Sequence, residues 1–255
     1  MITTLDGKFW SKEEILAFMM DDEFYYNYLG KNALSSSSVK RLLDSPKSYS
    51  QSFTTKEENS SALDFGWLFH TAILEPHIYR KQYFVDARRN TNKFKDARAE
   101  HGRVFTEGDR YNVERLATAF YDNSRAVDML NHTEKEVPAI GDLWDVPFRA
   151  KADILGDGYI VDLKTTTDVR NFKSSFWKWG YHCQAFIYCE LFGIKPENFW
   201  FIAVEKGTGV LGFYNVSESS YERGRDDVQK AVNIYKSYFI NKDMDLGDFA
   251  YEDTL

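Results

Sequence analysis

Two aspartates and a lysine lie close together between residues 153 and 164, and these residue types can support metal-dependent phosphoryl chemistry. Mg²⁺ takes oxygen ligands and keeps several waters, so one or two carboxylates can hold it. The ion lowers the pKa of a bound water and stabilises charge on the leaving oxygen. Lys164 lies two residues beyond Asp162, on the same face of a strand, where it can orient that water. We therefore predict a Mg²⁺ site, in which Mn²⁺ can substitute, formed by Asp153 and Asp162 with Lys164 beside it.

The position of a tight turn brings the two aspartates together. Asp157-Gly158 lies between two strand-like runs, which is a strong signal for a two-residue hairpin loop. With that loop, Gly156 pairs with Tyr159, and counting outward places Asp153 opposite Asp162. Like charges on opposed strands repel, so a cation is expected between them. The alternative is a surface hairpin whose acids face solvent and whose lysine forms an ordinary ion pair.

Four more side chains are candidates for the same site. Gln184 and Tyr188 are four residues apart, so they share one face of a helix that follows the lysine strand. His70 lies in an apolar helix, and Glu136 lies on the strand before the hairpin. Each has an alternative interpretation: Tyr188 as a core aromatic, His70 as a hydrogen-bonded core residue, and Glu136 as one of many strand acids.

Composition indicates a folded globular chain. The 255 residues are 43% hydrophobic and 16% aromatic, enough for one well-buried core. No apolar run reaches the roughly 18 residues of a membrane span, and the N-terminus lacks a secretion signal. Cys183 and Cys189 are poor disulfide partners, which favours a reducing cytoplasm. The net charge of −7 argues mildly against nucleic acid, although a nuclease can gather Lys and Arg in one channel.

Hydrophobic periodicity predicts the elements that position these residues. Helices are expected over 33–43, 62–74, 111–130, about 169–192 with a kink near Gly180, and about 218–239; strands are expected over 134–140, 143–155, 159–165, 199–205 and 210–216. This order predicts an α/β fold with a mixed central β-sheet flanked by helices. We expect a single domain over 1–255, with an N-terminal arm (1–32), a core (33–240) and an acidic, flexible tail (241–255). Residues 86–110, rich in Arg and Lys, are expected to be a surface insertion or a mobile segment.

Taken in order, these motifs resemble the PD-(D/E)xK nuclease superfamily in its RecB-like branch, and most of all the phage-type RecE (exonuclease VIII) group. The motifs are Leu34 to Tyr49, Gly66 to Pro76 with His70, Asp153, Asp162-Leu163-Lys164, and Gln184 with Tyr188. Ala152 stands where the superfamily has a proline before its first acid, a replacement that the RecB-like branch tolerates. The four cysteines that hold an iron–sulfur cluster in some relatives are missing.

The resemblance implies a restriction-endonuclease-like core and a role for each site residue. His70, Asp153, Asp162 and the backbone carbonyl of Leu163 are implied metal ligands, and Glu136 is a further candidate. Lys164 positions the attacking water, and Gln184 and Tyr188 brace the site or touch DNA. By analogy with phage exonucleases, Ser35, Ser37 and Arg41 hold a terminal 5′-phosphate. The alternative for the serines is helix capping.

The resemblance also implies an activity and partners. We expect a metal-dependent exodeoxyribonuclease that degrades linear double-stranded DNA, 5′→3′, and leaves 3′ single-stranded overhangs for phage-type recombination. DNA ends, a single-strand annealing protein and further copies of the chain in a trimeric or tetrameric ring are the expected partners, in the cytoplasm of a bacterial host. An endonuclease on the same fold and an inactive DNA-binding or assembly protein are the alternatives.

Overall fold

A mixed five-stranded sheet forms the centre of the computed structural model, which describes residues 1–54 and 60–250. Its strands are ordered β5 (Glu134–Leu143), β6 (Val146–Gly156), β7 (Tyr159–Thr166), β8 (Phe199–Glu205) and β9 (Leu211–Asn215). Only β7 and β8 are parallel, and the other neighbours are antiparallel. The predicted α/β class with a mixed central sheet is confirmed, and so is the chain order of its elements.

Two helices make the crossover that the parallel pair requires. They are α10 (Phe172–Lys178) and α11 (Tyr181–Phe192). Gly180 separates them with φ of 71°, a left-handed conformation that glycine adopts without a steric penalty, so the kink predicted near this residue is confirmed. Gly193 ends α11 in the same conformation.

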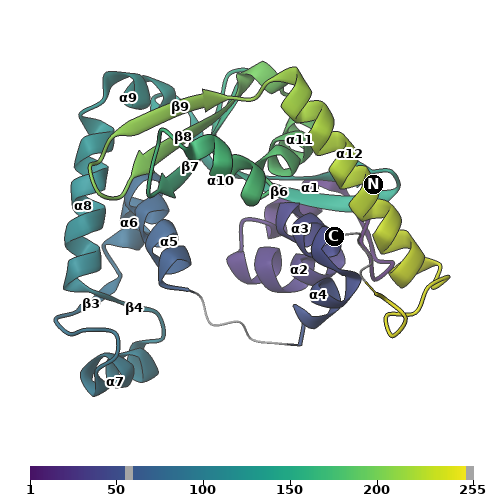
Figure 1. Ribbon diagram of the computed structural model, residues 1–255, viewed down its shortest axis with the longest axis horizontal. Coiled ribbons are helices and arrows are strands. Elements are labelled where there is room, and N and C mark those ends of the chain that lie inside the picture. The colour runs from purple at the N-terminus through teal and green to yellow at the C-terminus, as the bar shows by residue number, and fades with distance from the viewer. Residues whose placement is uncertain (55–59, 251–255) are drawn as a thin grey trace, which may run out of the picture.

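Helices cover both faces of the sheet, and each face has its own hydrophobic core (Figure 1). In β8, Phe201 and Ala203 face a core shared with α3 (Ser36–Asp44), α11 and α12 (Glu218–Tyr235). Ile202 and Val204 face the opposite core, shared with α5 (Ser61–Leu74), α8 (Glu107–Tyr121) and α9 (Ser124–Leu130). A strand buried on both faces explains the unbroken apolar run in 199–204.

Side-chain caps fix where the helices begin. Ser60 accepts a hydrogen bond from the Leu63 N–H at the start of α5, and Pro76 begins the short α6 (Pro76–Tyr79) directly after it. The predicted helix over 62–74 is thereby confirmed. Ser45 ends α3 and caps α4 (Pro46–Gln51), so a second helix directly follows the one predicted over 33–43.

The charged segment 86–110 contains regular structure. Strands β3 (Tyr83–Val85) and β4 (Val104–Thr106) pair in parallel, and α7 (Asn92–His101) connects them over a small core around Phe94. A capping box of Thr106 and Asp109 then begins α8. The helix predicted over 111–130 is two helices, because Asn123 caps a new start at α9.

The segment 1–32, expected as an arm, packs against the sheet. It comprises β1 (Ile2–Thr3), β2 (Phe9–Trp10), α1 (Lys12–Phe18), a π-helical turn (Phe24–Tyr28) and α2 (Leu29–Asn32). Its core includes Ile140 of β5, and Arg149 Nε of β6 donates to the Leu29 carbonyl at 3.1 Å. A backbone bridge from Leu34 to Phe148 adds a further link to β6.

At the other end of the chain, a π-helical turn (Lys236–Ile240) extends α12, and residues 241–250 fold back toward α4. Lys47 Nζ donates to the carbonyls of Gly247 (3.5 Å) and Phe249 (3.4 Å). The last part of the expected acidic tail, 251–255, lies outside the described residues. No helix in the described chain is both long and apolar enough to cross a membrane.

Candidate active site

Three carboxylates occupy one level across three neighbouring strands. The predicted hairpin register is confirmed, because Gly156 pairs with Tyr159. Continued outward, this register brings Asp153 of β6 level with Asp162 of β7, although the described ladder ends one residue before them. On the other side of β6, the β5 register brings Glu136 level with Asp153, and this position too is left out of the described ladder.

The sheet bonding is altered where the carboxylates meet. Asp153 Oδ2 accepts a hydrogen bond from the Leu163 N–H at 2.7 Å, so a side chain supplies the acceptor that a ladder carbonyl would normally provide. Glu136 has φ of 53°, a left-handed conformation that is uncommon for residues other than glycine. Such strain persists only where the surroundings hold it, and it concentrates at functional sites.

His70 reaches this level from α5. Its Nε2 lies 2.7 Å from the Leu163 carbonyl oxygen, and its Nδ1 lies 3.5 Å from Asp153 Oδ2. Ligand atoms of His70, Glu136 and Asp153 all lie within 4.8 Å of one another. One nitrogen with several hard oxygens suits a divalent cation of the Mg²⁺ or Mn²⁺ type. The structure thus brings together His70, Glu136, Asp153 and the carbonyl of Leu163, all predicted from sequence.

Asp162 lies at the centre of a second set of contacts. Its carboxylate is 2% exposed, forms an ion pair with Lys164 Nζ, and accepts a hydrogen bond from Gln184 Nε2. Lys164 Nζ contacts Oδ2 and Gln184 Nε2 donates to Oδ1, so both oxygens of this buried carboxylate have a partner in the protein. Asp162 is not part of the His70, Glu136 and Asp153 group in the described chain, so its role as a metal ligand stays a prediction. Lys164 Nζ also lies over the Tyr181 ring, 4.8 Å from its centroid.

Burial and mutual repulsion raise the pKa values of two of the three carboxylates, despite the positive charge of nearby lysines. Burial, followed by the charges of Asp153 and Glu75, raises the pKa of Glu136 to about 8. Burial raises the pKa of Asp162 to about 6; Lys164 opposes this shift and Asp153 adds to it. For Lys164, burial would lower the pKa, but the attraction of Asp162 outweighs it and the pKa is raised. A divalent cation would add positive charge and favour ionised carboxylates.

Tyr188 lies beside the candidate metal ligands, but no described hydrogen bond joins its hydroxyl to their carboxylates. Its hydroxyl donates to the Lys151 carbonyl at 3.0 Å, which ties α11 to β6. Lys151 Nζ in turn pairs with Asp22 of the N-terminal segment at 2.8 Å. Of the two residues predicted on this helix face, Gln184 contacts Asp162, whereas Tyr188 braces the neighbouring strand.

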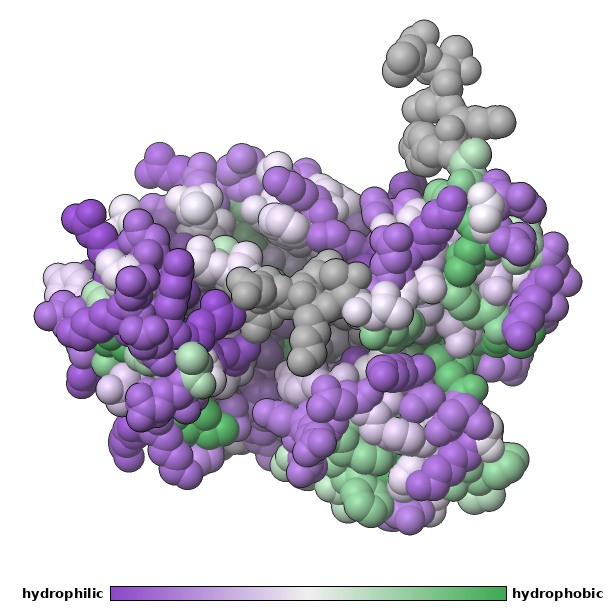
Figure 2. Space-filling model, turned by 90° about the horizontal axis from the view of Figure 1, so that it is seen from below, coloured by the Kyte–Doolittle hydropathy of each residue, from purple (hydrophilic) through white to green (hydrophobic). Residues whose placement is uncertain are grey.

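A cavity of about 870 Å³ opens onto the carboxylates. Its lining includes all the candidate ligand and helix-face side chains together with Arg149, Lys151, Lys206, Trp67 and Trp179. Figure 2 shows the surface hollowed between two sides, and the side that carries α7 is covered mainly by hydrophilic side chains. The N-terminal segment contributes Asp22, Tyr25 and Tyr26 to the lining.

The predicted phosphate-binding residues are only partly brought to this cavity. Ser35 and Ser37 line it, and Ser35 Oγ caps α3 by accepting from the Ser38 N–H at 3.4 Å. Their hydroxyl oxygens lie 2.9 Å apart. Arg41 is not among the residues that line the cavity in the described chain.

Arg88, Arg89 and Arg98 of the segment 86–110 are likewise not among the described residues that line the cavity. Arg89 instead forms ion pairs with Asp64 of α5 (3.5 Å) and Asp109 of α8 (2.8 Å). These contacts bind the inserted segment to the core, so for Arg89 the structure favours a structural role.

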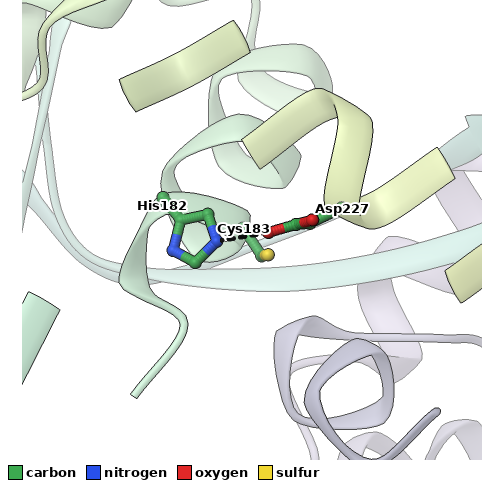
Figure 3. A group of neighbouring side chains, drawn as sticks. All are labelled: His182, Cys183 and Asp227. Carbon is green, nitrogen blue, oxygen red and sulfur yellow. Dashed lines mark hydrogen bonds and ion pairs between the residues drawn. The ribbon is translucent and has the colours of Figure 1, made fainter. Parts of the chain in front are cut away.

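A second group of potential ligands lies between α11 and α12 (Figure 3). His182 Nε2 and Asp227 Oδ2 are 3.0 Å apart, with Cys183 beside them, and Arg223 Nε donates to the same Asp227 oxygen at 3.2 Å. Since that oxygen already has two partners, we interpret the group as a link between the helices. Asp227 is 45 residues from His182, and nothing in the sequence indicated their contact.

The sheet order, the aligned carboxylates and the lysine define a PD-(D/E)xK-like domain. Residues 35–243 match the model of the family described as "PDDEXK-like domain of unknown function (DUF3799)". The match spans most of the chain, so this protein belongs to that family. All the candidate metal ligands lie inside the matched region, whereas residues 1–34 precede it. Among curated proteins, none matches the chain.

A solved structure has a similar fold. The "putative exonuclease" from Eubacterium rectale superposes with a TM-score of 0.65 at 15% sequence identity, and the alignment covers 92% of this chain and 95% of that chain. At this identity the likeness shows the fold alone. The structure of SSO0001 gives a TM-score of 0.31 at 14% identity over 77% of this chain and 85% of that chain, and we base no argument on it.

Proposed function

We propose that the protein is a metal-dependent deoxyribonuclease that hydrolyses phosphodiester bonds in this cavity. The observation that carries the proposal is the convergence of His70, Glu136, Asp153 and the Leu163 carbonyl beside the Asp162–Lys164 ion pair. Family membership and the "putative exonuclease" that shares the fold support it.

Each side chain has a role that follows from its contacts. His70, Glu136, Asp153, Asp162 and the Leu163 carbonyl would hold Mg²⁺ or Mn²⁺. The bound ion supplies an acidified water and stabilises charge on the phosphate. Lys164 can orient that water or neutralise a phosphoryl oxygen, because Asp162 fixes its ammonium group at the cavity floor. Gln184 in turn fixes Asp162, and Leu163 N–H fixes Asp153.

We further propose that the substrate is linear double-stranded DNA, degraded 5′→3′ to leave 3′ overhangs for recombination. Support comes from the serine-capped N-terminus of α3 on the cavity wall, because a helix N-terminus favours an anion such as a terminal phosphate. A ring of three or four copies and a single-strand annealing partner belong to the same proposal, and both rest on the RecE resemblance.

The first experiment incubates the protein with linear duplex bearing labelled 5′-phosphates and with closed circular duplex, in Mg²⁺, Mn²⁺ or EDTA. Metal-dependent loss of the linear DNA alone, with mononucleotides released from the labelled end, is the expected result. Cutting of the circle would assign an endonuclease on the same fold. No cleavage of either substrate in Mg²⁺ or Mn²⁺ would contradict the proposed activity and leave a DNA-binding or assembly role. Lys164→Met is the control for a contaminating nuclease.

A second experiment tests the phosphate site. Ser37→Ala is the cleaner variant, because Ser37 is exposed, whereas replacing the cap Ser35 also destabilises α3 by about 1 kcal/mol. The variant should degrade 5′-phosphorylated duplex more slowly than wild type and 5′-hydroxyl duplex at an unchanged rate. Equal slowing on both substrates would argue against a role in phosphate binding.

A further inference from the structure

An exposed indole lies on the wall of the catalytic cavity. Trp179 lies between α10 and Gly180, 48% of its surface is exposed, and it is one of the residues that line the cavity. The indole is therefore accessible to a ligand that enters the cavity. Its neighbour Trp177 is exposed to 40% but is not among the described lining residues.

Two ammonium groups lie against this indole. Lys40 Nζ of α3 is 4.2 Å from the ring centroid, and Lys178 Nζ of α10 is 5.0 Å from it. Neither lysine has an ion-pair partner in the part of the chain that the structure describes. Burial, followed by the charges of Lys178 and Arg41, lowers the pKa of Lys40, and the charge of Asp44 opposes this shift only in part. The site combines an aromatic face with cations that are free to move to an anion.

Trp67, the other tryptophan of the cavity wall, is arranged differently. Its ring stacks on Phe105 with centroids 5.9 Å apart, and Arg103 lies 4.3 Å from the ring centroid. Arg103 is itself paired with the carboxylate of Asp64 at 3.7 Å. The partners of Trp67 are therefore fixed by further contacts, whereas no ion pair within the described residues holds Lys40 or Lys178.

We propose that Trp179, Lys40 and Lys178 bind an unpaired segment of DNA at the cavity wall. The indole stacks on a base, and the two ammonium groups move from the ring to neighbouring phosphates. Only an unpaired or terminal base can offer its face to the ring, because neighbouring base pairs cover both faces inside a duplex. This inference rests on the proposed function and deepens it, because it specifies that the DNA bound at this wall is unpaired.

The test measures binding of fluorescein-labelled oligothymidylate of about 12 nucleotides and of a blunt duplex, in EDTA so that neither is cleaved. Trp179→Ala should weaken oligothymidylate binding roughly 5- to 100-fold and change duplex binding less than about twofold. Trp179→Phe should retain most of the affinity because it keeps a stacking ring. Trp177→Ala is the matched control, and it should bind both probes like wild type. Thermal unfolding of each variant confirms that it is folded.

The lysines are tested by salt dependence. Replacing Lys40 and Lys178 together by Met should reduce the slope of log affinity against log salt for oligothymidylate by about 0.7 for each phosphate that a lysine no longer neutralises. An unchanged slope would exclude them from phosphate binding and overturn this part of the assignment.

The outcomes separate this inference from the proposed function. Wild-type affinity for oligothymidylate in a folded Trp179→Ala protein, or equal weakening for both probes, overturns the inference even if the enzyme cleaves DNA. Binding that depends on Trp179 in a protein that cleaves no DNA with Mg²⁺ or Mn²⁺ supports the inference and rejects the nuclease.

Discussion

Asp153 Oδ2 accepts a hydrogen bond from the backbone N–H of Leu163 at 2.7 Å, at the level where the ladder between β6 and β7 ends. The same carboxylate thus completes the sheet and faces the proposed metal. These two tasks can be separated by substitution, because one needs only an acceptor oxygen and the other needs charge.

Asp153→Asn keeps the acceptor for Leu163 and removes one of three crowded carboxylates. We expect the metal-free protein at pH 7.5 to be as stable as wild type or more stable by up to about 1 kcal/mol. Asp153→Ala leaves the Leu163 N–H without its acceptor and should lower the free energy of unfolding by about 1–3 kcal/mol. Both variants should lose Mn²⁺ affinity and at least about 100-fold in cleavage rate. Urea unfolding and calorimetry with Mn²⁺ measure the two effects, and equal stability of the two variants would contradict this account.

Lys164→Met should reduce cleavage by about 100- to 1000-fold and leave DNA binding largely unchanged. It also leaves the Asp162 carboxylate buried without its ion-pair partner. The metal-free variant should therefore be about 3 kcal/mol less stable at pH 8, and the loss should shrink toward pH 5 as Asp162 takes up a proton. Denaturant unfolding at both pH values measures this, and Lys164→Arg, which retains the charge, is the control. A loss of stability that does not depend on pH would show that the unpaired Asp162 carboxylate is not its cause.

Raised carboxylate pKa values give the metal-free protein a distinct pH dependence. The folded protein holds protons on Asp162 up to about pH 6 and on Glu136 up to about pH 8, well above the values in the unfolded chain. The folded state binds more protons in this window, so stability falls as pH rises from about 4 to 8, by at most about 1.4 kcal/mol per pH unit for each group.

Mn²⁺ should counteract this loss of stability, because binding displaces the same protons, and its apparent affinity should rise over the same range. Glu136→Gln should flatten the upper part of the stability profile. Thermal unfolding across pH, with and without Mn²⁺, measures both effects, and stability that rises from pH 5 to pH 8 without metal would contradict the assignment.

Gly224 of α12 is required by the close packing of α12 against α11. A Cβ at this position would lie 2.3 Å from the His182 carbonyl oxygen, which is backbone and cannot turn away. Gly224→Ala should therefore lower the free energy of unfolding by about 1–3 kcal/mol, although alanine normally stabilises a helix by about 1 kcal/mol.

The matched control for Gly224 is Gly108→Ala in α8, where the nearest atom to the new Cβ would be Thr106 Oγ1 at 3.5 Å. This change should be neutral or stabilising. Chemical unfolding of the two variants compares them directly, and a shift of the same sign in both would show that packing does not distinguish these positions.

Hydrophobic patterning was sufficient to predict the sheet, because its strands are long and apolar. It missed β3 and β4, which have three residues each, too few to show a period. The predicted strand over 143–155 was also wrong at its start, because Trp144 and Asp145 form a turn between β5 and β6. Both φ angles of this turn are positive (49° and 59°), but the sequence has neither the Asn nor the Gly that usually marks such a turn.

The hairpin register could be counted from sequence, and it placed Asp153 level with Asp162. What could not be counted is how the backbone changes at that level. Residue types predict neither the left-handed conformation of Glu136 nor the hydrogen bond that the Leu163 N–H donates to the Asp153 side chain. Both depend on three strands and α5 meeting at one place, which only the tertiary structure defines.

The N-terminal segment helps to form the cavity, although it lies outside the region that the family model matches. The family match begins at residue 35, yet Asp22, Tyr25 and Tyr26 line the catalytic cavity, and Asp22 holds Lys151 of β6. A fragment trimmed to the matched residues would keep every candidate metal ligand and lose one wall of the cavity. Relatives that differ before this boundary could therefore share one catalytic chemistry and select different substrates.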